Sequence, residues 1–214
     1  MNESAQDISA AISALASARS EEREAAAAAI FHAALREAEP LARAWASEPE
    51  FARLIGAPAP SITAGVAVEP ELFVAIRNAN GSPRLSDVPA EQDVLEYHLN
   101  FSQGAGAVAR LEILTARDPS GEGAVARYLR KFGRNIQHIE IATSDVDRAV
   151  EILRTRFALQ PIYAQAHPGA DGSRINFFLV ANPQGKKLLV ELEEEAIVAA
   201  YDRSRHVMCG RTPE

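Results

Sequence analysis

Two stretches decide the fold of this chain, N-I-Q-H-I-E-I-A at residues 135–142 and K-K-L-L-V-E-L-E-E at residues 186–194. Each alternates apolar and polar residues, which predicts a half-buried strand whose successive side chains point to opposite faces. His138 and Glu191 therefore lie near the middle of strands, where an ordinary core favours apolar residues. Two side chains able to bind a metal at such positions indicate a reaction site.

The residues between and around these strands complete a unit in the order β-α-β-β-β. The S-D-V-D segment at 144–147 begins a helix with an apolar stripe, and a strand follows over 159–166. After a Gly-rich loop at 167–173, strands over 174–180 and 186–193 end the unit. This order predicts one compact module.

The first half of the chain has the same order of elements. We expect a strand at 61–68, a helix or strand at 70–79, a weak strand near 83–88, strands at 94–101 and 107–115, and a short basic helix at 124–132. The repeat predicts an α+β fold in which paired βαβββ modules form a cup-shaped mixed sheet, with helices covering the outside.

The composition divides the chain into three regions. We expect a helical extension at 1–56, the paired modules at 57–195 (first module 61–115, second module 134–195) and a C-terminal tail at 196–214. The A-P-A-P stretch that begins at Ala57 marks the first boundary. Within the extension, one helix begins at Ser20 and ends near Glu37, and Pro40 suits the first turn of a weaker helix. The extension is interpreted as a packing or dimerising appendage.

Charge and cysteine content exclude several classes of function. The 214 residues carry a net charge of −7, which argues against nucleic acid as the main partner. The single Cys209 excludes an internal disulfide and a cysteine metal cluster. The start of the chain lacks the pattern of a signal peptide, and no apolar run is long enough to span a bilayer. We therefore expect a cytoplasmic protein that does not bind membranes.

Strand alternation places one polar set on the inner face of the cup. Its members come from four strands and are His138, Glu191, Glu112, and Glu96 together with His98. Imidazole and carboxylate groups bind divalent cations such as Mg²⁺, Mn²⁺, Fe²⁺, Co²⁺ or Zn²⁺. Such an ion can polarise a carbonyl, and a nearby carboxylate can move a proton. The alternative is that these polar faces simply meet water.

Four segments of the second half resemble one known family. They are G-A-V-A-R-Y-L-R-K (123–131), I-Q-H-I-E-I-A-T-S-D-V-D-R-A-V (136–150), P-G-A-D-G-S-R-I-N-F (168–177) and G-K-K-L-L-V-E-L (185–192). These segments resemble the vicinal oxygen chelate superfamily, and within it the methylmalonyl-CoA epimerases. The resemblance implies paired modules and one divalent metal in the cup.

The resemblance also implies roles for individual residues. His138, Glu191 and Glu112 match the family's metal ligands, and the segment E-Q-D-V-L-E makes Glu96 the match for a catalytic acid/base. Where the first module should have a ligand histidine, this chain has Thr63, so His98 is a weaker candidate for the fourth ligand.

The resemblance implies a metal-dependent isomerase or epimerase. It would move an α proton of a small carbonyl or acyl-CoA-like substrate through a metal-stabilised enolate, with Glu96 and Glu191 as the proton-handling groups. The metal would be Co, Mn, Fe, Mg, Ni or Zn, no organic cofactor is expected, and the chain would form a homodimer. The alternatives are a non-haem iron dioxygenase or lyase on the same fold, and a metal-free small-molecule binding protein.

Overall fold

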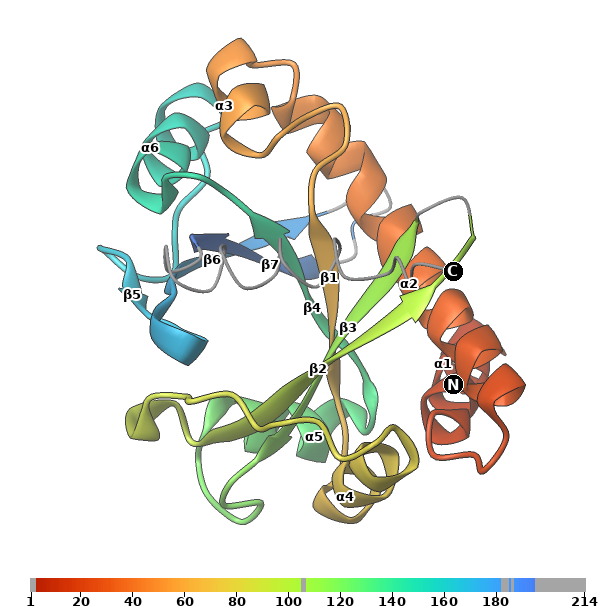
Figure 1. Cartoon of the computed structure of the whole chain (residues 1–214). Coiled ribbons are helices and arrows are strands. Elements are labelled where there is room, and N and C mark those ends of the chain that lie inside the picture. Colours follow the sequence, from red (N-terminus) through yellow and green to blue (C-terminus); the bar gives the residue numbers. More distant parts are fainter. Residues whose placement is uncertain (1–2, 105–106, 182–184, 186, 195–214) are drawn as a thin grey trace, which may run out of the picture.

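The computed structural model describes residues 3–104, 107–181, 185 and 187–194, so the predicted tail at 196–214 lies outside the described residues. Within them, one mixed sheet has the strand order β2-β3-β1-β4-β7-β6-β5 and curls into a half-barrel (Figure 1). Its strands are β1 (Ile62–Ala67), β2 (Val94–Ser102), β3 (Val108–Ala116), β4 (Asn135–Ala142), β5 (His167–Pro168), β6 (Arg174–Ala181) and β7 (Lys187–Glu194). The predicted α+β class and cup-shaped mixed sheet are confirmed.

Helices and short 3-10 turns surround the sheet. They are α1 (Glu3–Ala14), α2 (Ser20–Trp45), α3 (Pro49–Leu54), α4 (Pro70–Ala79), α5 (Ala124–Phe132), α6 (Val146–Arg156), η1 (Ala90–Gln92) and η2 (Ala170–Gly172). The segment at 70–79, which fitted either period, is thus a helix. Among the described residues, none of these helices has the length and apolar character to cross a membrane.

The centre of the sheet relates the two modules by an approximate two-fold axis. There β1 pairs with β4 in antiparallel register, while β3 runs parallel to β1 and β7 runs parallel to β4. On each strand the apolar residues face outward to the helices, as Val66, Ile113, Ile139 and Val190 do. The polar set therefore faces the inside of the cup.

The strand expected near 83–88 is absent. In this segment the Ser86 amide donates to the Glu96 carbonyl at 3.0 Å, but no ladder forms. Pro83 and Pro89 stand at its two ends, and proline lacks the amide hydrogen that a strand ladder needs. The first module consequently has one strand fewer than predicted.

The strand expected over 159–166 is also absent, apart from a bridge between Pro161 and Phe178. One backbone hydrogen bond, from the Ile162 N–H to the Phe177 carbonyl at 2.7 Å, and one side chain replace the missing strand pairing. The amide group of Asn176 accepts from the Tyr163 backbone N–H at 3.2 Å and donates to the Tyr163 carbonyl at 3.1 Å. Asn176 is fully buried, so these two bonds fix the path of the segment.

Pro40 does not begin a new helix, because α2 continues through it to Trp45. Proline inside a helix removes one backbone hydrogen bond. Here Pro40 is exposed, so water can satisfy the carbonyl that loses its partner. The buried stripe of Ala34, Ala38 and Trp45 continues past the proline and holds the helix against the sheet.

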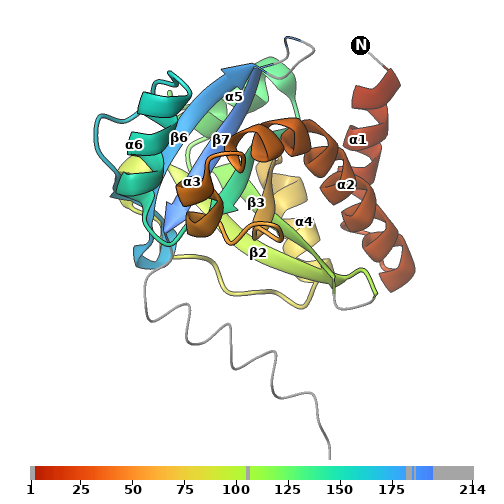
Figure 2. The same ribbon diagram turned by 90° about the horizontal axis from the view of Figure 1, so that it is seen from above.

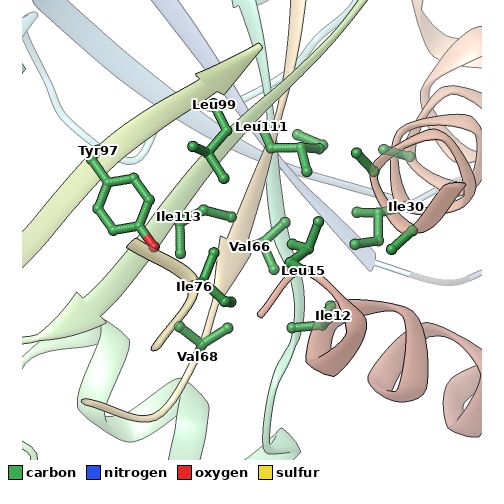
Figure 3. Close-up of a cluster of buried hydrophobic side chains, with 14 of the residues drawn as sticks. Ile12, Leu15, Ile30, Val66, Val68, Ile76, Tyr97, Leu99, Leu111 and Ile113 are labelled. Carbon is green, nitrogen blue, oxygen red and sulfur yellow. The ribbon is translucent and has the colours of Figure 1, made fainter. Parts of the chain in front are cut away.

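The N-terminal helices pack on the outer faces of both modules (Figures 1 and 2). Ile12, Leu15 and Ile30 join Leu111 and Ile113 in the core of the first module (Figure 3). Further along, Trp45, Phe51 and Ile55 join the core of the second module with Ile141 and Phe178. Arg148 of α6 also makes a two-pronged ion pair with Glu50 of α3, at 2.7 and 2.6 Å. The extension is therefore part of both cores.

Truncating the Phe51 side chain tests this packing. Phe51 is fully buried, so Phe51→Ala should lower the free energy of unfolding by about 3–5 kcal/mol, measured by denaturant titration. The matched control is Phe132→Ala, because Phe132 is 55% exposed and its loss should change stability by less than about 1 kcal/mol. Equal effects of the two variants would show that α3 is only loosely attached.

Two loops close the open side of the cup. Asp171 in η2 accepts from the Asp87 backbone N–H and from Arg84, both at 2.9 Å. Its own backbone N–H donates to the Asp87 carbonyl, and the Gln92 side chain donates to the Pro168 carbonyl at 2.8 Å. These bonds join the loop before β2 to the loop before β6, so the two ends of the curled sheet are tied together.

Candidate active site

Six polar residues lie buried on the inner face of the cup, each at most 9% exposed. They are Thr63 on β1, Glu96 on β2, Glu112 on β3, His138 and Glu140 on β4, and Glu191 on β7. Strand alternation explains why they share this face, since the residues between them are the outward apolar positions of the two cores. A buried set of four carboxylates and one imidazole requires compensation of its charge.

His138 stands at the centre of this cluster. Its Nε2 lies 2.8 Å from Glu112 Oε2 and 3.2 Å from Glu191 Oε2. On the other side of the ring, Nδ1 contacts Gln137 Oε1, which can only accept, so Nδ1 carries the hydrogen in this contact. Nε2 is then the ring atom that faces the two carboxylates.

Gly65 makes the position of His138 possible. The two residues are directly opposite each other in the β1–β4 register. A Cβ atom on Gly65 would lie 2.1 Å from His138 Cε1 and 2.4 Å from both ring nitrogens. The imidazole therefore lies over the bare backbone of β1, which no other residue type would allow.

Neither His138 Nε2 nor Glu112 Oε2 has a hydrogen-bond partner, although both atoms are buried and close together. Their contact is thus one of distance and charge without hydrogen-bond geometry. Buried polar atoms are nearly always satisfied, and exceptions are typical of functional sites. The arrangement suits two ligand atoms that bind the same cation.

Glu96 and Glu112 form a coupled pair beside His138. Burial and the adjacent Glu112 charge raise the pKa of Glu96 to about 11. Burial acts in the same direction on Glu112, but His138 and a hydrogen bond from Glu96 outweigh it and lower the pKa of Glu112 to about 2. One proton therefore lies on Glu96, which can act as an acid inside the cup.

Glu140 is the buried carboxylate of β4 and lies two residues beyond His138. Thr63 Oγ1 donates to Glu140 Oε1 at 3.2 Å. Burial and the charge of Glu193 raise the pKa of Glu140 well above its ordinary value. Burial and the charges of Glu112 and Glu140 do the same to the pKa of Glu191. Burial and mutual repulsion thus disfavour the charged forms of these carboxyl groups unless a positive charge is nearby.

The structure brings together three of the four predicted metal ligands, His138, Glu112 and Glu191. The fourth, His98, lies opposite Glu112 in the β2–β3 register and is half-buried. No contact between His98 and His138 is found among the described residues. Alternation alone placed Glu140 on the same face as His138, but nothing in the sequence marked it, or Gly65, as functional.

The residues present fit a divalent cation by their chemistry. In the part of the chain that the structure describes, no three His, Cys, Asp or Glu side chains are arranged to hold an ion as they stand. The separations of 2.8 and 3.2 Å around His138 Nε2 are nevertheless close to the ~3.0 Å between neighbouring ligand atoms of an octahedral ion with bonds of about 2.1 Å. A cation would also offset the repulsion among the carboxylates.

Aromatic side chains form one wall beside the cluster. Phe177 on β6 lies opposite Glu191 in the register, and its ring meets the His138 ring edge-on with centroids 6.2 Å apart. The Tyr163 ring lies between the rings of Phe177 and His167, edge-on to Phe177 with centroids 6.0 Å apart and tilted against His167 with centroids 4.0 Å apart. This wall gives the inner face an apolar side next to its charged floor.

The arginines in and just after the basic helix α5 are engaged locally. Arg130 donates to the Gly121 carbonyl at 2.7 Å and pairs with Glu122 at 3.2 Å. Arg134, just beyond the helix, pairs with Glu69 at 3.1 Å. These contacts hold the connection between the modules.

Comparison with known proteins places this site in a family context. The chain matches no family model, and no curated protein matches it. Solved structures do match. A methylmalonyl-CoA epimerase from Mycobacterium tuberculosis is 28% identical, with a TM-score of 0.51 over 65% of this chain and 89% of that chain.

Two further structures carry ligands. A single-residue variant of the Streptomyces coelicolor methylmalonyl-CoA epimerase, bound to 2-nitronate-propionyl-CoA, is 27% identical with a TM-score of 0.51 over 63% of this chain and 93% of that chain. A methylmalonyl-CoA epimerase bound to methylmalonyl-CoA and NH4⁺ is 27% identical with a TM-score of 0.51, covering 64% and 94%. The resemblance to methylmalonyl-CoA epimerases of the vicinal oxygen chelate superfamily is confirmed.

Proposed function

We propose that this chain, an epimerase-type isomerase by its likeness to the methylmalonyl-CoA epimerases, moves the α proton of an acyl-CoA-like thioester. One observation carries the proposal. Two buried carboxylates, Glu96 and Glu191, come from β2 and β7, with β3, β1 and β4 between them in the sheet. They therefore stand on opposite sides of His138 and Glu112, as proton transfer on both faces of a substrate carbon requires.

The chemistry needs one group to hold the substrate carbonyl and two to handle the proton. His138, Glu112 and Glu191 would hold a divalent cation, which when bound polarises a carbonyl oxygen and favours the enolate. Glu191 would take the α proton on one side, and Glu96, whose raised pKa keeps it protonated, would return one on the other side. For the opposite epimer, Glu96 would remove the α proton and Glu191 would return one.

The wall of Phe177 and Tyr163 supports the choice of a thioester. An apolar wall beside the charged floor suits an acyl group, and it keeps water away from the enolate. The two ligand-bound epimerases that match this chain hold acyl-CoA compounds, which supports the same class of substrate here.

The test is solvent exchange at the α carbon. Purified full chain, loaded with Co²⁺ or Mn²⁺, is incubated with methylmalonyl-CoA in D₂O, and deuterium at the α carbon is followed by NMR. We expect exchange that depends on enzyme concentration and is lost on chelation. Propionyl-CoA, malonyl-CoA and succinyl-CoA serve as further substrates. Metal-loaded protein that catalyses no exchange with any of these thioesters would contradict the proposal.

A further inference from the structure

The pairing registers define which residues of the two modules correspond. Gly65 is opposite Glu112 in the β1–β3 pair, and Glu140 is opposite Glu191 in the β4–β7 pair. Since Glu112 and Glu191 occupy the same place in their modules, Gly65 corresponds to Glu140. Two residues earlier on each strand, Thr63 corresponds to His138. The approximate symmetry thus puts a hydroxyl where the second module has its imidazole.

In each of the two symmetry-related pairs across β1 and β4, a small residue on β1 faces a large residue on β4. In one half, the small Gly65 leaves room for the large His138 across the strand pair. In the other half, the small Thr63 faces the large Glu140 across the same pair. Glu140 therefore fills, from β4, the space that a histidine at position 63 would fill from β1. It is buried at 6% exposure and turned toward Thr63.

From this arrangement we infer that Glu140 supplies the fourth metal ligand, in place of the missing first-module histidine, and that Thr63 positions it. The inference rests on the proposed metal site. Thr63 Oγ1 holds the Oε1 atom of Glu140, and the carboxyl group would exchange its present hydrogen bond with Glu193 for the metal. Support comes from the register, in which Glu140 lies opposite Glu191, and from two buried atoms of the same cluster that have no hydrogen-bond partner, His138 Nε2 and Glu112 Oε2. Glu193 is the present neighbour of Glu140 and lies further along β7.

The exchange of a histidine for a glutamate changes the kind of ion that the site prefers. Three carboxylates and one imidazole form a harder and more negative set than one containing two imidazoles. Carboxylate-rich sites suit Mg²⁺ and Mn²⁺, whereas imidazole suits Zn²⁺, Ni²⁺ and Cu²⁺. Relative to Zn²⁺, the chain should therefore bind Mn²⁺ better than a site with two histidines would.

Calorimetric titration of the chelator-stripped full chain with Mn²⁺ tests the inference. Wild type should bind one ion per chain, and Glu140→Ala should weaken binding by about 100-fold or more, at or beyond the upper end of what loss of an outer-shell partner causes. Glu140→Gln, which keeps the volume and an acceptor for Thr63, should fall between them. Glu193→Ala is the matched control, because it removes a carboxylate from the same cluster, and it should weaken binding by less than about 10-fold.

A second experiment moves the fourth ligand from β4 to position 63 on β1. The double variant Thr63→His with Glu140→Ala restores a first-module histidine and the small residue opposite it. It should recover binding lost in Glu140→Ala and bind Zn²⁺ and Co²⁺ better, relative to Mn²⁺, than wild type does. If Glu140→Ala binds Mn²⁺ like wild type while Glu191→Ala does not, the inference fails and the proposed function stands. If wild type binds neither Mn²⁺ nor Co²⁺, both fail.

Discussion

Replacing Glu96 with glutamine is expected to slow deuterium exchange at the substrate α carbon by about 10²–10⁴-fold, the usual contribution of a general acid/base. The amide cannot give up or accept the proton that Glu96 holds beside Glu112. It can still donate a hydrogen bond to Glu112 and has almost the same volume. Glu96→Gln should therefore fold and bind metal like wild type while losing turnover.

The matched control for this variant is Glu91→Gln. It makes the same chemical change in the same segment, but Glu91 is exposed and lies outside the cup. Its exchange rate should equal that of wild type. If Glu96→Gln exchanges at the wild-type rate, Glu96 is not the acid/base, and a single carboxylate would have to serve both faces of the substrate.

Adding one methyl group at Gly65 is expected to abolish most activity without removing any functional group. The new Cβ atom would lie 2.1 Å from His138 Cε1, so the ring must leave its position between Glu112 and Glu191. Displacement of a reacting group by about 1 Å can reduce a rate by about 10²-fold. Overpacking of this kind should also lower the free energy of unfolding by about 1–3 kcal/mol.

A double-mutant cycle isolates the cause of that effect. In the His138→Ala background the clash partner is gone, so Gly65→Ala should have no further effect on stability. Strong non-additivity of the two changes is the expected result, because the residues are in direct contact. Additive losses of stability would mean that Gly65 is needed for the backbone of β1 and not for the imidazole.

The sequence predicted the strands of the site well because apolar and polar residues largely alternate along them. Glu112 and Glu191 each stand between apolar neighbours, and His138 precedes the apolar Ile139, so the face of each side chain on its own strand followed from periodicity. Periodicity could not show that the segments at 83–88 and 159–166 do not form strands. The path at 159–166 depends on the side chain of Asn176, a contact across the fold that leaves no local pattern.

The same limit explains the missed residues. Glu140 belongs to the correct face, but its nearness to Thr63 depends on the register between β1 and β4, which a single strand does not specify. Pro40 suited the first turn of a separate, weaker helix, but α2 continues through it, and its last residue, Trp45, packs in the core of the second module. Local propensity is a weak guide wherever tertiary packing decides.

The position of α3 has a consequence for how this protein folds. Its partners are in the second module, so Glu50 and Arg148 are joined across 98 residues of chain. Closing so long a loop is slow, and during synthesis the early helices must wait for the last strands to emerge before their apolar faces are covered. The two repeated halves, alike as they are, should consequently unfold in one cooperative transition, and neither half is expected to survive separation from the other.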